Sequence, residues 1–187
     1  MGGKKMRQTG ENVSPMSNEG RNQYVVEHIT EAMLKLMKNT NFNDISISQV
    51  CEEAGVGRAS FYRNFENKEA VISRYLKKLL DEWQTKTAQK PDLHWVEAIF
   101  LHYWEHRELC IMLYKQGLAH LSLQSIKELC GPKPEQSNLI AYTTAYVSYG
   151  LYGWIEEWFK RGMKETPKEM AVLLIKAQSL SPKEGSE

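Results

Sequence analysis

The sequence AGVGRASFYRNFENKEA, residues 54–70, is the most informative segment of this chain of 187 residues. Two glycines stand close together, and Arg, Ser, Tyr and Asn side chains then surround two phenylalanines. Phe61 and Phe65 are four residues apart, so a helix buries both on one face. A helix that only filled a core would not carry so many hydrogen-bonding side chains. We therefore expect its other face to bind a partner.

A short helix is expected immediately before the glycines. Ser46 and Gln49 have the spacing of a capping box, in which each side chain bonds the backbone of the other residue. Gly55 suits the position after the end of a helix, where φ is positive. Val56 is expected to fill the turn as an apolar plug, and a third helix follows over about residues 58–65. Two short helices joined by a turn that contains glycine form a helix-turn-helix.

The polar face of the third helix suits duplex DNA. Arg pairs with guanine or phosphate, Asn with adenine, Ser and Tyr with phosphate, and Ala contacts the methyl group of thymine. The alternative is an amphipathic helix whose polar face is only solvated. The order of capped helix, glycine turn, apolar plug and mixed polar face favours DNA. The residues expected to face DNA are Arg58, Ala59, Ser60, Tyr62, Arg63 and Asn64.

At these residues the sequence resembles the TetR-like (TetR/AcrR) family of bacterial transcriptional regulators. The resemblance covers about residues 22–72 and includes Ser46, the Ala-Gly-Val of 54–56, the Ser-Phe-Tyr-Arg-Asn-Phe of 60–65 and the Lys-Glu-Ala of 68–70. It implies that residues 58–60 enter the major groove.

The resemblance also implies contacts with the DNA backbone. Tyr62 would contact a phosphate or a base methyl group, and Ser46 would cap the second helix near a phosphate. Asn64 and Lys68 would each reach a phosphate, Lys68 from the start of a fourth helix, where the helix dipole favours an anion. Gly57 stands where many members of the family have Ser or Thr. One hydroxyl that would cap the helix or reach a phosphate is therefore absent.

Composition limits the classes that remain. The chain is 42% hydrophobic and 25% charged, which is typical of a globular protein. No apolar run is long enough to span a bilayer, and the N-terminus lacks the apolar segment of a secretory signal. Three cysteines without C-x-x-C spacing indicate a reducing compartment. We therefore expect a cytoplasmic protein with no membrane partner.

The sequence predicts an all-α fold in which an N-terminal three-helix helix-turn-helix domain is joined to a C-terminal helical bundle, with about nine helices in total. Residues 1–18 are expected to be a disordered tail. Residues 19–66 are expected to be the DNA-binding domain and 67–90 a connecting helix. Residues 91–187 are expected to be a helical domain for ligand sensing and dimerisation. The first 90 residues carry 14 Lys and Arg against 11 Asp and Glu, which permits nucleic-acid binding without requiring it.

The C-terminal half has more aromatic residues than one monomer core needs. Its segment WIEEWFKRGMKETPKEMAVLL, residues 154–174, resembles the last helix pair of the C-terminal domain common in TetR-like regulators of Gram-positive bacteria (Firmicutes). The resemblance implies a four-helix interface between two copies, which would space two recognition helices for a palindrome. The alternative is a core within one monomer. The expected interface residues are Tyr149, Gly150, Gly153, Trp154 and Trp158.

Family members commonly hold a small-molecule effector inside this bundle. The candidate pocket residues, each of which is alternatively ordinary core, are Tyr103, Trp104, Met112, Tyr114, Tyr142 and Tyr146. His102, His106 and Cys110 share one face if their helix is continuous. A helix break is expected near His106 and no fourth ligand is evident, so we predict neither a metal site nor a cofactor.

The function expected from these features is a ligand-responsive repressor that binds a palindromic duplex operator as a homodimer. One alternative is an activator, or a regulator of the same fold that responds to a protein. A more remote alternative is a helical interaction module or an enzyme whose helix-turn-helix is only structural. The chain has no G-x-G-x-x-G, P-loop, G-x-S-x-G or H-E-x-x-H motif, so we do not expect an enzyme.

Overall fold

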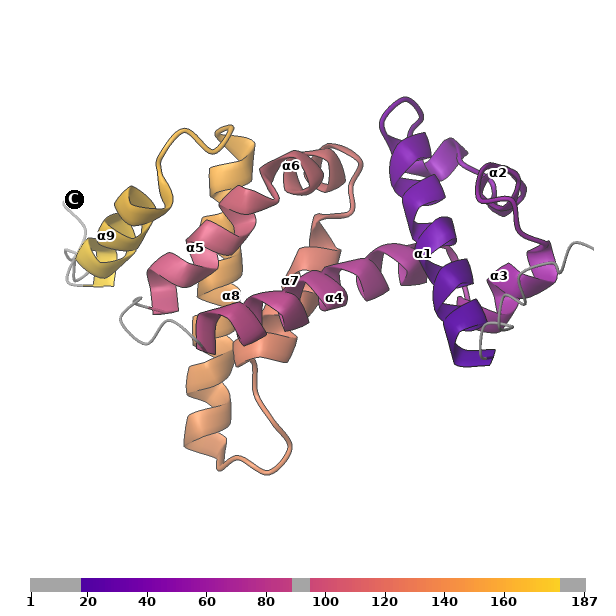
Figure 1. Ribbon diagram of the computed structural model, residues 1–187. Coiled ribbons are helices and arrows are strands. Elements are labelled where there is room, and N and C mark those ends of the chain that lie inside the picture. The colour runs from indigo at the N-terminus through magenta and orange to yellow at the C-terminus, as the bar shows by residue number, and fades with distance from the viewer. Residues whose placement is uncertain (1–17, 89–94, 179–187) are drawn as a thin grey trace, which may run out of the picture.

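The structure is a computed structural model that describes residues 18–88 and 95–178. Within these ranges it consists of nine α-helices and one 3-10 turn, with no strand, so the all-α prediction is confirmed. The first three helices form one end of the molecule, and α4 runs from them to the C-terminal bundle (Figure 1). The elements are α1 (Asn18–Met37), η1 (Phe42–Asp44), α2 (Ile47–Glu53), α3 (Arg58–Asn64), α4 (Lys68–Ala88), α5 (Trp95–Glu105), α6 (Arg107–Lys115), α7 (Ala119–Cys130), α8 (Asn138–Lys160) and α9 (Pro167–Gln178). The tail predicted over residues 1–18 lies outside the described residues except for Asn18.

The local signals at the helix-turn-helix act as the sequence predicts. Ser46 Oγ accepts a hydrogen bond from the Gln49 amide at 3.2 Å, and Gln49 Oε1 accepts one from the Ser46 amide at 2.8 Å. Gly55 has a φ of +65°, a conformation that a side chain would strain. Phe61 and Phe65 are buried with their ring centroids 5.7 Å apart. Two aromatic side chains therefore hold α3 against the domain.

The structure has two apolar cores, one in the N-terminal helices and one in the C-terminal helices. The first contains residues of α1, α2, α3 and the first half of α4, with Phe61 and Ile72 fully buried in it. The second is formed by α5 to α9 around Phe100 and Trp158. Long α4 contributes to the first core and reaches the second, so its position affects both.

The two cores are joined at two places. Trp83 Nε1, near the end of α4, donates a hydrogen bond to the Ala98 carbonyl oxygen of α5 at 3.0 Å. The corner between α6 and α7 enters the first core through Leu113, Leu118 and Leu121, although both helices also contribute to the second. The helix-turn-helix domain therefore touches the bundle through this corner as well as through α4.

The ends of the C-terminal helices also follow the sequence signals. The predicted break near His106 is confirmed, because α5 ends at Glu105 and α6 begins at Arg107. Gly162 follows α8 with a φ of +79°. Thr166 and Glu169 form a capping box, in which the Thr166 amide donates to Glu169 Oε2 at 2.8 Å. None of the described helices combines the length and the apolar character that crossing a bilayer requires.

Candidate nucleic-acid interface

Helix α3 presents a polar face to solvent. Tyr62 is 52% exposed, and its ring meets the buried Phe61 ring edge-on with the centroids 5.6 Å apart. Among the described residues, neither Arg58 nor Arg63 pairs with a carboxylate, so both guanidinium groups are available to an outside partner. The exposed or half-buried side chains on α3 are those of Arg58, Ala59, Ser60, Tyr62, Arg63 and Asn64. The structure thus brings all six residues predicted for this helix onto one accessible element.

Gly57 is the N-cap residue of α3. Its φ of −74° and ψ of 150° are extended values that any residue adopts, and it makes no side-chain cap bond. A Cβ built on Gly57 would meet no atom within 4 Å. The site therefore has room for the hydroxyl side chain that many TetR-like sequences carry, and its absence leaves the first amides of α3 without a side-chain cap.

Two of the predicted phosphate contacts already have partners within the protein. The Ser46 hydroxyl donates to Gln49 Oε1 at 2.8 Å while it accepts the Gln49 amide. Asn64 Nδ2 donates to the Ser60 carbonyl oxygen at 2.9 Å, which folds the amide back along its own helix. A phosphate would have to bind a Ser46 or Asn64 side chain that already makes these bonds within the protein. Both phosphate contacts therefore stay predictions.

Lys68 points toward the protein rather than toward the predicted phosphate. Its Nζ donates to the carbonyl oxygens of Phe42 at 2.6 Å and Ile45 at 2.5 Å, with a longer contact to Asn43 at 3.5 Å. The ammonium also lies 4.6 Å from the centroid of the Phe42 ring. Burial lowers the pKa of Lys68, and the nearby Asp44 carboxylate opposes that shift. The predicted phosphate contact conflicts with this geometry, in which the ammonium holds the η1 turn that precedes α2.

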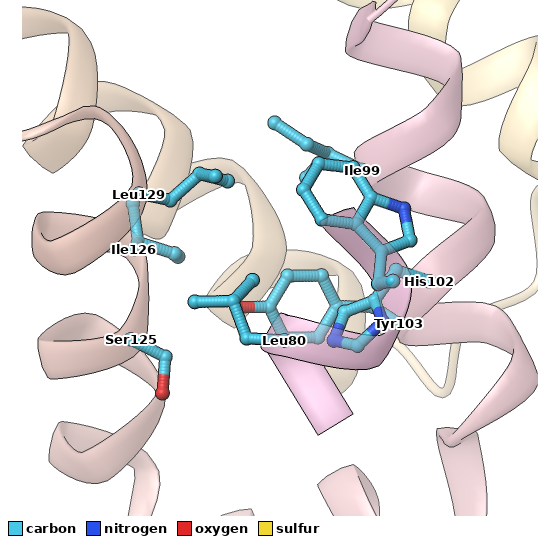
Figure 2. Close-up of a pocket in the computed structure, with 8 residues that line it drawn as sticks. Leu80, Ile99, His102, Tyr103, Ser125, Ile126 and Leu129 are labelled. Carbon is cyan, nitrogen blue, oxygen red and sulfur yellow. The ribbon is translucent and has the colours of Figure 1, made fainter. Parts of the chain in front are cut away.

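A small cavity lies between α4, α5 and α7 in the C-terminal half (Figure 2). Its volume is about 10 Å³, which is room for about one water molecule. Leu80 of α4, His102 and Tyr103 of α5 and Leu129 of α7 line it. Burial lowers the pKa of His102 to about 4, and burial raises the pKa of Tyr103. Both side chains are therefore neutral near pH 7, and an effector larger than a water molecule would have to separate these helices.

The side chains predicted to line an effector pocket do not converge on this cavity. Of the six predicted pocket residues, only Tyr103 lines the cavity. Met112 faces a separate groove of about 700 Å³, which lies between α1, α4 and the junction of α5 and α6. Tyr114 packs at the edge of the second core. Tyr142 and Tyr146 are 72% and 81% exposed on α8, away from the cavity and the groove, so their assignment to a pocket stays a prediction.

The aromatic residues of α8 divide between two faces. Trp158 is 2% exposed, meets the Phe100 ring at a centroid distance of 5.5 Å and stacks on Trp104 at 5.9 Å. The helix thus turns the Trp158 side chain into the core of its own monomer, and its predicted place at a dimer interface stays a prediction. Trp154 is half-buried. Tyr149, Gly150 and Gly153 are exposed, as an interface would require of the free monomer.

The three residues considered for a metal site do not form one. Helix α5 stops before His106, and Cys110 is buried in the second core with burial raising the pKa of its thiol to about 12. The rings of His102 and His106 lie 5.1 Å apart, centroid to centroid. In the described part of the chain no group of three or more His, Cys, Asp or Glu side chains is placed to hold a metal ion.

Two protein-family models match the chain. Residues 29–75 match a model described as bacterial regulatory proteins, tetR family. This range contains α2, the glycine turn and the whole of α3. Residues 93–179 match a model described as a transcriptional regulator C-terminal region.

The chain belongs to the TetR family. It is accordingly a DNA-binding transcriptional regulator. The narrower resemblance of the C-terminal half to regulators of Gram-positive bacteria stays a prediction, because the matching model carries no such restriction. No curated protein sequence matches this TetR-family chain.

Proposed function

We propose that this TetR-family regulator is a repressor that binds a palindromic operator as a homodimer and releases it when an effector binds the C-terminal half. The observation that carries the proposal is the construction of α3. Phe61 and Phe65 bury one face of that helix, while the unpaired Arg58 and Arg63 lie on the accessible surface. A rigid helix with free cations and small polar neighbours suits the major groove of DNA.

Each side chain of α3 has a proposed task. Arg58, Ala59 and Ser60 at its N-terminal end would read base edges, because that end of a recognition helix enters the groove. Tyr62 and Arg63 would hold phosphates and fix the register of the helix. The Ser46 and Asn64 side chains would contact the DNA backbone at the rim of this surface.

The proposed dimer rests on apolar side chains that one monomer leaves exposed on two helices, α8 and α9. Leu139, Tyr142 and Tyr146, in the first half of α8, are 76%, 72% and 81% exposed. On α9, Val172 and Ile175 are 44% and 50% exposed. A monomer rarely leaves so much apolar surface in water. A second copy would cover these side chains and set two α3 helices about 34–36 Å apart, the spacing of successive major grooves.

The proposed effector response uses the cavity of Figure 2. The cavity walls come from α4, α5 and α7, so a ligand that widened it would displace α4 relative to α5. Helix α4 also contributes to the core beneath α3, so the displacement would change the separation of the two recognition helices. We place the regulator in the cytoplasm, because a bacterial operator lies on the chromosome there.

Selection of duplexes from a random library by the purified protein tests the proposal. We expect a palindrome with half-sites about one helical turn apart and two chains bound per site. Adding the protein to an in vitro transcription reaction that carries the selected site should reduce the transcript. The variant Arg58→Ala should lose the preference at one base pair of each half-site, while Arg161→Ala, at the far end of α8, should keep the full preference. A selected site without symmetry would contradict the dimer, and an increase in transcript would replace repression by activation.

A further inference from the structure

Gln116, the C-cap residue of α6, binds the backbone of the helix-turn-helix domain with both ends of its amide. Its Nε2 donates to the Met37 carbonyl oxygen at the end of α1 at 2.8 Å. Its Oε1 accepts a hydrogen bond from the Phe42 amide at the start of η1 at 2.9 Å. Both bonds are partly buried, and they cross 79 and 74 residues of sequence. One side chain of the C-terminal half thus spans the turn that joins α1 to α2.

The surroundings of Gln116 fix its position. Leu113, Leu118 and Leu121 flank it in the sequence and are 0%, 3% and 7% exposed within the core of the helix-turn-helix domain. Gly117 has a φ of +76°, which allows the sharp corner between α6 and α7. The Leu118 amide closes the corner with a bond to the Leu113 carbonyl oxygen at 2.8 Å. The amide of Gln116 is therefore carried on a rigid corner.

The η1 turn is held from its other side by Lys68. The Lys68 ammonium binds the carbonyl oxygens of Phe42 and Ile45, so Phe42 has its N–H on Gln116 and its C=O on Lys68. Ile45 directly precedes Ser46, the N-cap of α2. Any shift of η1 therefore moves the start of the helix on which α3 packs.

We infer that Gln116 is a positioning residue that couples the C-terminal bundle to the recognition helix through η1. A movement of α6 relative to α4 would pull on one side of the turn while Lys68 holds the other. This route adds to the connection through α4 and enters the domain beside α2. The inference rests on the proposed response of DNA binding to the C-terminal half. Coupling is reciprocal, so DNA bound at α3 must also stabilise the corner between α6 and α7.

Hydrogen exchange of the full-length protein, with and without the duplex that the parent selects, tests this coupling without knowledge of the effector. Gln116→Leu removes both bonds and keeps an apolar stem. Gln116→Glu keeps an acceptor for the Phe42 amide and lacks the donor for Met37. Gln124→Leu is the control, because Gln124 is exposed on α7 and bonds only Glu128 of its own helix.

In the parent and in Gln124→Leu, we expect added DNA to slow exchange in residues 107–121 as well as in α2 and α3. In Gln116→Leu, exchange around Phe42 should be about fivefold faster, the effect of one lost hydrogen bond. In the same variant, the DNA-induced protection of residues 107–121 should fall by at least about half. The protection in Gln116→Glu should lie between that of the parent and that of Gln116→Leu. Undiminished protection of residues 107–121 in both Gln116 variants would overturn the inference, even if η1 is loosened, since a purely local role predicts that result. A parent that selects no duplex would refute the proposed function and this inference with it.

Discussion

Replacing Lys68 by methionine separates a role inside the protein from a role at DNA. Methionine keeps the unbranched chain but removes the ammonium, and with it the bonds at 2.6 and 2.5 Å to the carbonyl oxygens of Phe42 and Ile45. A hydrogen bond to a charged group contributes about 1.5–3 kcal/mol, and the half-buried position of Lys68 reduces that value through solvent screening. We expect the free energy of unfolding to fall by about 2 kcal/mol.

Urea unfolding at fixed protein concentration measures that loss of stability. DNA titrations at several salt concentrations measure how steeply the affinity for DNA falls with salt. A lysine that neutralises a phosphate contributes about 0.9 to the slope of log affinity against log salt. Because the ammonium of Lys68 is directed at η1, Lys68→Met should bind DNA more weakly with an unchanged slope. Lys78→Met, which removes an exposed charge from the same helix, is the control for net charge. Unchanged stability together with a shallower slope would show that Lys68 contacts a phosphate and does not hold η1.

Four further substitutions test other parts of the structure. Gly57→Ser adds a cap where a Cβ meets no atom within 4 Å, so the free energy of unfolding in urea should rise by about 0.5 kcal/mol; a fall would contradict the cap geometry. Burial lowers the pKa of His102 to about 4. Between about pH 6.5 and 4 the unfolded chain therefore binds more protons than the folded chain, and the free energy of unfolding falls by up to about 3 kcal/mol as the pH falls through that window. Unfolding curves of His102→Leu should lack this part of the acid sensitivity. Identical pH profiles of stability for the parent and the variant would show that the folded protein does not hold the His102 imidazole in its neutral form. Tyr146→Glu should raise the dissociation constant of the proposed dimer at least about 100-fold in analytical ultracentrifugation, since the charge enters the interface twice; an unchanged constant would move the interface elsewhere. Arg58→Ala should reduce discrimination at one base pair of each half-site by about 1–3 kcal/mol in competition titrations, and uniform weakening at all sites would reassign Arg58 to a phosphate.

The helix-turn-helix could be predicted from the sequence because its signals are local. The Ser46–Gln49 capping box, the positive φ of Gly55 and the two buried phenylalanines each depend on residues a few positions apart. The break at His106 follows the same logic. Residue types and spacing are sufficient at such positions, and the chain obeys them.

The roles of Lys68 and Gln116 could not be predicted, because their partners are backbone groups far away in the sequence. The Phe42 amide and carbonyl carry no residue signature, and the bonds appear only when α4 and α6 are packed against η1. Judged only by its residue type and its position at the start of a helix after the recognition motif, Lys68 is expected to contact a phosphate. Tertiary packing directs it inward instead.

The inner and outer faces of α8 could not be predicted for a different reason. Aromatic residues occupy nearly every turn of this helix, so the pattern alone does not distinguish the inner from the outer side. The structure turns Leu151, Ile155 and Trp158 into the core, and it leaves Tyr142 and Tyr146 in solvent. The two tyrosines predicted for the pocket thus join the proposed dimer surface, and the tryptophan predicted for the interface belongs to the core.

A salt titration with paired duplexes shows whether α3 reads DNA in the major groove. Affinities of the parent for the selected duplex and for a scrambled duplex of equal length are measured over a range of salt concentrations. We expect both affinities to fall steeply with salt, as phosphate contacts require, and Arg58→Ala to reduce the ratio between them. A parent that does not distinguish the two duplexes, or whose affinity is independent of salt, would contradict the assignment of α3 as a recognition helix.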